Sequence, residues 1–289
     1  MDEMTGHLLE LIRLASTDLP ADIEDALKAA RDKEDPGSRP AAVLDTILEN
    51  VRMARTRSTP ICQDTGLLNF FVKHPPGASH GEFVEAAGKA AAQATEKNYL
   101  RPNAVHPVTG KNTGDNTGEG LPIFYFEEGD PGAWEVSLLL KGGGSENVGA
   151  QFKLPDPSLQ AGRDLDGVRR VMLQAVLQAQ GLGCAPGVLG VGIGGDRAGS
   201  MALAKKQLLR PLPDRNPDPE LASLEAGLLE EANRMGIGPM GLGGRTTVLG
   251  VKAGVGHRHP ASYFVSLAYF CWAARRRRLV VNEEGVTLA

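Results

Sequence analysis

Three cysteines are the residues of this chain with the most distinctive chemistry. The 289-residue sequence places them far apart, at Cys62, Cys184 and Cys271. No closely spaced pair such as C-x-x-C occurs, which argues against a structural zinc site or an ordinary ferredoxin motif. Three dispersed thiolates could still hold a cubane iron–sulfur cluster and leave one iron open as a Lewis acid. Spacing alone, however, favours three thiols buried in the core.

Glycine-rich turns surround two of these cysteines. The 36 glycines gather in four segments, "ICQDTG", "KGGGSENVG", "GLGCAPGVLGVGIGGD" and "GIGPMGLGGRTT", each next to a predicted strand. Glycine lets a backbone approach a ligand closely, so converging turns would line a pocket with amide donors. Tight-turn chemistry is the alternative for any one of them.

One glycine pattern imitates a dinucleotide-binding site. Gly190, Gly192 and Gly195 have the G-x-G-x-x-G spacing. The complete fingerprint also needs an acid about 20 residues further on, at the end of a second strand. The nearest acid, Asp214, lies in the proline-rich stretch "PLPDRNPDPE", where no strand is expected. The pattern therefore argues against a nicotinamide or flavin site.

Helices and strands must position these segments. Apolar residues at helical spacing predict helices over residues 8–14, 23–30, 42–51, 82–97, 165–180 and 221–235. Runs of aliphatic and aromatic residues predict strands over 67–72, 123–126, 134–140, 188–193 and 246–251, and a last strand or helix ending at Cys271. Helices gather at the N-terminus and strands in the remainder, an order that predicts an α+β fold.

Composition and charge narrow the function classes. The formal net charge is -4 with no broad basic face, which gives no support for nucleic-acid binding as the main task. Four arginines at residues 275–278 are the exception, and we interpret them as a solvated helix end or subunit contact rather than a phosphate site. No membrane span or basic signal peptide is visible, so we expect a cytoplasmic protein with reduced thiols.

Six segments carry a family resemblance. They are "CQDTG", "YLRPNAVHPVTGKNTGDNTG", "KGGGSEN", "GCAP...GVGIGGD", "GIGPMGLGGRTT" and "HRHPAS...C". In this order they resemble the alpha subunit of iron–sulfur class I fumarases and L-tartrate dehydratases. The resemblance spans residues 58–275, which would form the cluster- and substrate-binding region. Residues 1–57 would be a helical lead-in, and residues 1–289 together one catalytic domain.

The resemblance implies a cofactor. In the family, three cysteines bind a [4Fe–4S] cluster, and the matching positions here are Cys62, Cys184 and Cys271. The open iron would bind the substrate hydroxyl and one carboxylate. Gln63 and Asp64 would face the substrate beside the cluster.

Roles follow for other matched positions. Asp64 would protonate the departing oxygen as a general acid, the alternative being an Asx turn with the residues after it. Arg101 in "YLRPN" would clamp a substrate carboxylate, the alternative being a surface salt bridge. His259 would hydrogen-bond a carboxylate, and Gly143 and Gly144 would offer backbone amides. The segment "KNTGDNTG" could equally consist of turns that support the site.

The resemblance also implies a partner. In the family, a beta subunit or a fused C-terminal domain supplies the catalytic base, with further arginine and lysine for the carboxylates. This sequence ends where the alpha region ends, so we expect a separate beta subunit, alpha–alpha pairing and two copies of each chain. Fumarate hydratase is the main hypothesis and L-tartrate dehydratase the alternative. A non-catalytic iron–sulfur sensor or scaffold is the second alternative, although such a protein has no need of an acid and a carboxylate clamp.

Overall fold

The fold is described from a computed structural model covering residues 2–289. The chain divides into two compact units that interleave in sequence. Unit 1 contains the chain up to Pro20, Glu49–Gly143 and Arg275–Ala289, and unit 2 contains Ala21–Leu48 and Gly144–Ala274. Helix α3 (Arg39–Arg57) begins in unit 2 and ends in unit 1. A single domain over residues 1–289 remains a prediction.

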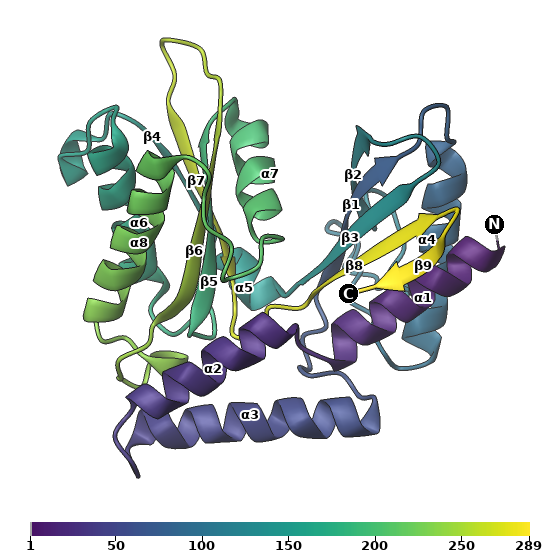
Figure 1. The fold of residues 1–289 in the computed structure, drawn as a ribbon, viewed down its shortest axis with the longest axis horizontal. Helices are drawn as coiled ribbons and strands as arrows, with labels where there is room; N and C mark the ends of the chain where they lie inside the picture. Colours follow the sequence, from purple (N-terminus) through teal and green to yellow (C-terminus); the bar gives the residue numbers. More distant parts are fainter. Residues whose placement is uncertain (1) are drawn as a thin grey trace. The chain divides into compact units, whose positions relative to one another are not determined.

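Unit 1 is built on a five-stranded mixed sheet with strand order β2-β1-β3-β8-β9. Strands β1 and β2 run parallel and the other neighbours antiparallel. Its elements are α1 (Asp2–Thr17), β1 (Leu67–His74), α4 (His80–Glu96), β2 (Ile123–Glu128), β3 (Trp134–Lys141), β8 (Arg276–Asn282) and β9 (Gly285–Leu288). Helices α1 and α4 lie side by side and share one core with the apolar side chains of β1 and β3 (Figure 1).

Alternation along the strands explains that core. In β1, Leu68, Phe70 and Val72 point to the same face and are buried, as expected for side chains with a period of two. Helix α4 meets this face with an alanine-rich stripe, and Ser79 caps it by accepting a hydrogen bond from the Glu82 amide at 3.3 Å. Small side chains allow the helix to approach the sheet closely.

Unit 2 is built on a four-stranded sheet with order β4-β7-β5-β6. Strands β5 and β6 are parallel, and β7 is antiparallel to both of its neighbours. Its elements are α2 (Ala21–Lys33), β4 (Ala150–Lys153), η1 (Pro157–Leu159), α6 (Leu165–Ala179), β5 (Gly187–Gly194), α7 (Arg197–Gln207), α8 (Pro219–Arg234), η2 (Pro239–Gly241), β6 (Val248–Gly256) and β7 (Phe264–Phe270). The short helix α5 (Gly143–Asn147) spans the boundary between the units.

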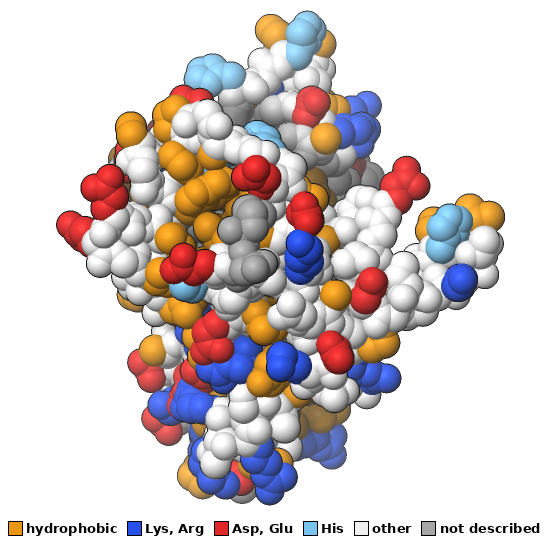
Figure 2. All heavy atoms as spheres, turned by 90° about the vertical axis from the view of Figure 1, so that its right-hand side faces the viewer, with side chains coloured by type: hydrophobic (Ala, Val, Ile, Leu, Met, Phe, Trp, Pro, Cys, Tyr) orange, Lys and Arg blue, Asp and Glu red, His pale blue; other side chains and the backbone are white. Residues whose placement is uncertain are grey.

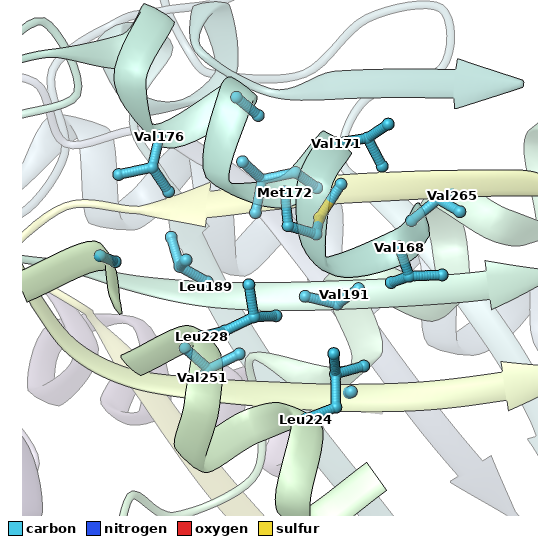
Figure 3. Close-up of a cluster of buried hydrophobic side chains, with 14 of the residues drawn as sticks. Val168, Val171, Met172, Val176, Leu189, Val191, Leu224, Leu228, Val251 and Val265 are labelled. Atoms are coloured by element: carbon cyan, nitrogen blue, oxygen red, sulfur yellow. The ribbon is translucent and has the colours of Figure 1, made fainter. Parts of the chain in front are cut away.

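The core of unit 2 lies on one face of its sheet. Figure 3 shows Val168 and Met172 of α6 and Leu228 of α8 packed over Leu189 and Val191 of β5. Helix α7 contacts β5, β6 and β7, and every residue of β5 is buried. Helices on both faces therefore explain why β5 reads as a continuous apolar and glycine run.

The α+β fold predicted from the sequence is confirmed, and the predicted helices and strands form with end shifts of a few residues. The segment ending at Cys271 is a strand, β7. Several short elements were not predicted, among them α5 inside "KGGGSEN", the strand β4, the turns η1 and η2, and the C-terminal hairpin β8 and β9. Short length, or the arginine run in β8, hides these elements from periodicity, and contacts with neighbouring elements hold them in place.

The interpretation of residues 275–278 as a solvated helix end is wrong. Arg275 is 1% exposed and Arg276 8%, and the segment enters strand β8. Arg278, further along β8, is exposed and pairs with Glu135 of β3 at 2.5 Å. Strand pairing with β3 thus decides the structure here.

Charges on the face drawn in Figure 2 are interspersed, with Asp and Glu among Lys and Arg. Arg55 and Asp18 form one of the ion pairs of the described residues, at 2.5 Å. None of the helices described within residues 2–289 is long and apolar enough to cross a membrane.

Candidate functional site

The loop of residues 62–66 carries the first group of candidate residues, in unit 1 between α3 and β1. Gly66 has φ +80°, and a Cβ there would stand 2.7 Å from the carbonyl carbon of Lys141. A side chain is therefore excluded by both backbone conformation and space. The absence of a side chain on Gly66 lets the loop pack directly against the end of strand β3. Cys62 and Asp64 are half-buried in this loop, and Gln63 is exposed.

The two carboxylate oxygens of Asp64 have different surroundings. Oδ1 accepts a hydrogen bond from the Gly66 amide at 3.1 Å, so the Asx turn weighed from the sequence is present. Oδ2 faces the "KGGG" turn: a Cβ on Gly142 would lie 2.8 Å from it, and one on Gly143 would lie 3.9 Å away. One oxygen shapes the loop while the other points at backbone. The turn geometry and a chemical role are thus compatible in the same side chain.

Arg101 is attached to this loop through its backbone. Its amide donates to Thr65 Oγ1 at 3.0 Å, and the Asn103 side chain donates to the same oxygen at 2.9 Å and to the Gly66 carbonyl at 3.2 Å. The Arg101 side chain itself is exposed. Thr65, which is fully buried, therefore ties "RPN" to the residue next to Asp64.

A buried asparagine forms further hydrogen bonds with the "RPN" segment. Asn116 is 2% exposed with φ +62°, and its Nδ2 donates to the Arg101 carbonyl at 2.9 Å and to Thr95 Oγ1 at 2.8 Å. Its Oδ1 accepts from the Asn103 amide at 2.8 Å. The "KNTGDNTG" segment thus forms turns that support the site. Asn116 was not among the candidate residues predicted from the sequence, although its position between polar turn residues indicates a structural turn.

The neighbouring Asp115 is part of the same turn. Burial raises the pKa of its carboxyl, but hydrogen bonds from the Thr117 amide and hydroxyl and from Thr113 outweigh this and hold the pKa below its usual value. The Thr117 amide and hydroxyl lie 2.9 and 2.8 Å from Asp115 Oδ1. The ionised form of Asp115 is therefore the one that stabilises the turn.

The other two cysteines meet at one end of the unit 2 sheet. Cys184 precedes β5, Cys271 follows the antiparallel neighbour β7, and the Trp272 amide donates to the Cys184 carbonyl at 3.1 Å. Cys184 has φ +56°, a conformation that non-glycine residues rarely adopt. Strand pairing thus brings together two thiols that are 87 positions apart in sequence.

Tyr269 packs beneath this strand end. It is 1% exposed, and its ring fills the space left by Gly183 and Gly187, since a Cβ on Gly183 would lie 2.6 Å from the ring. Burial, and after it the nearby Cys271 and Cys184, raises the pKa of the Tyr269 hydroxyl. The phenol therefore stays protonated at neutral pH. Two glycines of "GLGCAPG" serve this packing.

His259 lies elsewhere in unit 2. It is exposed in the loop between β6 and β7, where its Nδ1 accepts from the Ala261 amide at 3.1 Å. Cys271 lies beyond the opposite end of β7, which places the two residues roughly 20 Å apart along an extended strand. Within one chain, unit 2 does not bring His259 to Cys184 and Cys271.

The dinucleotide-like glycines have a packing role. A Cβ on Gly190 would overlap the Ala204 carbonyl of α7, and a Cβ on Gly192 would overlap the Ser200 carbonyl. Both glycines therefore let α7 lie directly on β5, which accounts for the pattern without a nucleotide.

The cysteines are divided between the units. Cys62 and Asp64 belong to unit 1, Cys184 and Cys271 to unit 2, and Gly143 and Gly144 stand on either side of the boundary. Across residues 2–289, no cluster of three or more His, Cys, Asp or Glu side chains is found that could hold a metal ion. All three cysteines are thiols.

Comparison with known proteins adds an independent finding. The sequence profile of the family described as fumarate hydratase (Fumerase) matches residues 5–280. A putative fumarate hydratase class I of Geobacillus stearothermophilus is 50% identical over 279 residues, which are 96% of this chain and 54% of that protein. The chain thus spans about half the length of this relative.

Two further relatives match over almost their whole length. A putative L(+)-tartrate dehydratase subunit alpha of Methanocaldococcus jannaschii is 38% identical over 95% of this chain and 96% of its own. The L(+)-tartrate dehydratase subunit alpha of Escherichia coli K12 is 34% identical over 98% of this chain and 92% of its own.

Proposed function

Because the chain belongs to the fumarate hydratase (Fumerase) family, we propose that it is the alpha subunit of a hydro-lyase that interconverts fumarate and L-malate. One structural observation supports this most strongly. The Asp64 carboxylate is fixed beside the "KGGG" turn, and Thr65 ties Arg101 to the same loop. An acid and a carboxylate-binding cation held on one rigid element suit a dicarboxylate substrate.

The three cysteines fit the cofactor of such an enzyme. Cys62, Cys184 and Cys271 would hold a [4Fe–4S] cluster, because dispersed thiolates are the ligands such clusters take. Cys184 and Cys271 already share one strand end, and a cytoplasmic, reducing compartment would keep the thiols available. When bound, the cluster would supply a Lewis acid for the substrate hydroxyl.

The chain's own residues would handle one proton and the substrate's charge. In dehydration of malate, a C–H bond and the C–O bond break, and water leaves. Asp64 would donate the proton that converts the leaving hydroxyl to water. Arg101 would bind a carboxylate with its planar fork, and Gln63, Gly143 and Gly144 would add polar contacts.

A partner subunit would remove the other proton. Relatives of matching length carry the name subunit alpha, which implies a separate beta subunit. We propose that this subunit supplies the base and the remaining carboxylate contacts, in an assembly of two copies of each chain.

His259 would then act across the alpha–alpha pair. Because it lies at the opposite end of β7 from Cys271, it can contribute to that site only from a second copy. Mixing inactive Asp64→Asn and His259→Ala chains should restore about one quarter of the native rate, since half of the pairs are mixed and each contains one intact site. Absence of any recovery would restrict His259 to its own chain.

L-tartrate dehydratase is the second candidate, favoured by the almost complete overlap with tartrate dehydratase alpha subunits. The test is turnover by the purified two-chain complex on L-malate, fumarate and both tartrates. Interconversion of malate and fumarate supports the proposal. Conversion of L-tartrate alone would replace it with the second candidate, and an iron-loaded complex inert on all four would favour a sensor or scaffold.

A further inference from the structure

Arg275 is a buried arginine for which neither the family nor the proposed reaction gives a role. It is 1% exposed, and its side chain is the largest of the fully buried side chains among the described residues. Its backbone is anchored, since its carbonyl accepts from the Leu140 amide of β3 at 3.0 Å. The side chain is thus held at a defined place in unit 1.

Two nitrogen atoms of its guanidinium have no hydrogen-bond acceptor in the described part of the chain. Nε and Nη1 are both buried and have no hydrogen-bond partner among the described residues. Arginine stays protonated in proteins, and a buried charge without a partner costs several kcal/mol. In the less buried Arg277, Nη2 donates to Asp18 at 3.0 Å and to the Leu19 carbonyl at 3.2 Å. Nε and Nη1 of Arg275 are therefore buried donors that no acceptor among the described residues satisfies.

The guanidinium lies beside the Asp64 carboxylate. A Cβ on Gly142 would stand 3.6 Å from Arg275 Nη2 and 2.8 Å from Asp64 Oδ2. The two side chains thus approach the same point of the "KGGG" turn. A fixed cation at this point attracts a negatively charged substrate that is placed next to Asp64.

We propose that Arg275 binds a carboxylate of the substrate beside Asp64, using the donors that are unpartnered in the ligand-free chain. A planar guanidinium can hold a carboxylate in a bidentate arrangement by pairing Nη2 with either Nε or Nη1. The inference rests on the proposed function, because that function supplies the dicarboxylate. Arg275 would act together with the exposed Arg101, the buried arginine fixing one carboxylate before the reaction begins.

The first test measures stability without ligand. Arg275→Gln and Arg275→Met remove a buried charge whose Nε and Nη1 donors have no acceptor among the described residues, so both variants of the full chain should melt at or above the native temperature. Arg278→Gln, which loses only the exposed pair with Glu135, is the control. Melting of both Arg275 variants well below this control would show a structural cation and overturn the proposal.

The second test measures binding of succinate, a dicarboxylate without the hydroxyl group or double bond of the substrates, to the two-chain complex by calorimetry. Arg275→Gln should weaken binding on the order of 10- to 100-fold, the usual effect of losing hydrogen bonds to a charged group, while Arg278→Gln should not. Unchanged succinate affinity would overturn the proposal. So would a loss of kcat on L-malate at constant KM, which would mean that Arg275 acts on Asp64 instead.

These outcomes separate the two hypotheses. Succinate binding that depends on Arg275, in a complex inert on malate, fumarate and tartrates, would reject the hydro-lyase and keep the carboxylate site. Malate turnover with a KM indifferent to Arg275→Gln would keep the hydro-lyase and reject the site.

Discussion

Asp64 illustrates how one side chain can hold a turn and remain chemically competent. Oδ1 accepts the Gly66 amide, while Oδ2 points at the "KGGG" turn. A general acid needs a carboxyl fixed in position, and the Asx turn supplies that fixation. The structural and catalytic interpretations therefore reinforce each other.

Asparagine separates these two roles. Asp64→Asn keeps the size of the side chain and the Asx turn but removes the carboxylic proton. We expect unchanged melting, iron content and substrate KM, with turnover of L-malate lowered roughly 10²- to 10⁴-fold. Normal turnover at full iron content would assign Asp64 to turn structure alone.

Gly142 offers a test of the same geometry from the opposite side. Gly142→Ala places a methyl group within 2.8 Å of Asp64 Oδ2, so the carboxylate must move. We expect kcat to fall at least 10-fold, because small displacements of a catalytic group are costly. Gly88→Ala in α4 is a matched control, since no atom lies within 4 Å of its new methyl group. Equal rates in the two variants would contradict the placement of Asp64.

At the scale of elements, turns rather than helices position the candidate residues. The loop of residues 62–66, the "RPN" segment and the "KNTGDNTG" segment are joined by hydrogen bonds through Thr65, Asn103 and Asn116. Each of these buried groups is satisfied by the others. Losing one leaves several donors and acceptors without partners.

Asn116 should therefore matter for both stability and binding. Asn116→Ala should lower the free energy of unfolding by about 1–3 kcal/mol, the usual cost of leaving buried polar groups unpaired, and raise the substrate KM through Arg101. The exposed Asn112, which also bonds turn backbone, is the control and should cost less. Denaturant unfolding and steady-state kinetics check both effects. Normal stability in Asn116→Ala would argue against the network.

The pKa of Asp115 predicts a pH dependence of this turn. Its folded pKa lies below its usual value, so its contribution to stability is present above pH ~4, where the unfolded carboxyl is also ionised. The contribution disappears as pH falls through the folded pKa. Asp115→Asn should therefore reduce stability at pH 7 but make little difference under strongly acidic conditions. A pH-independent difference in unfolding free energy would rule out this origin.

The sequence predicted these elements unevenly. Periodic apolar residues fixed the long helices and β1, β3 and β5, because burial determines such segments. The hairpin of β8 and β9 escaped prediction, since consecutive arginines look solvated until strand pairing buries Arg275 and Arg276. The family resemblance indicated Asp64 and Arg101, but no pattern predicted that Asn116 would connect their loops. The separation of His259 from Cys271 depends on strand direction, which the motif did not show.

At the scale of the whole molecule, the candidate residues divide between two units. Unit 1 supplies Cys62, Asp64 and Arg101, and unit 2 supplies Cys184 and Cys271. Binding of the proposed cluster by the three cysteines is therefore expected to be coupled to folding.

The cysteines can be tested by iron content. Anaerobically reconstituted protein should hold about four irons per chain, and Cys62→Ser, Cys184→Ser and Cys271→Ser should each lose the cluster absorption near roughly 400 nm. Cys184→Ser tests the pair of cysteines at one end of the unit 2 sheet, where Cys184 and Cys271 already lie together. A variant that retains a full cluster would show that its cysteine belongs to the core.

The proposed two-chain hydro-lyase is tested most directly by measuring fumarate formation from L-malate in three anaerobic samples of iron-loaded protein. The samples are this chain alone, the beta subunit alone, and the two combined. We predict turnover only in the combined sample, because the proposed acid and the proposed base belong to different chains. Sustained turnover by this chain alone would contradict the divided active site, and an inert combined sample with full iron content would contradict the hydro-lyase itself.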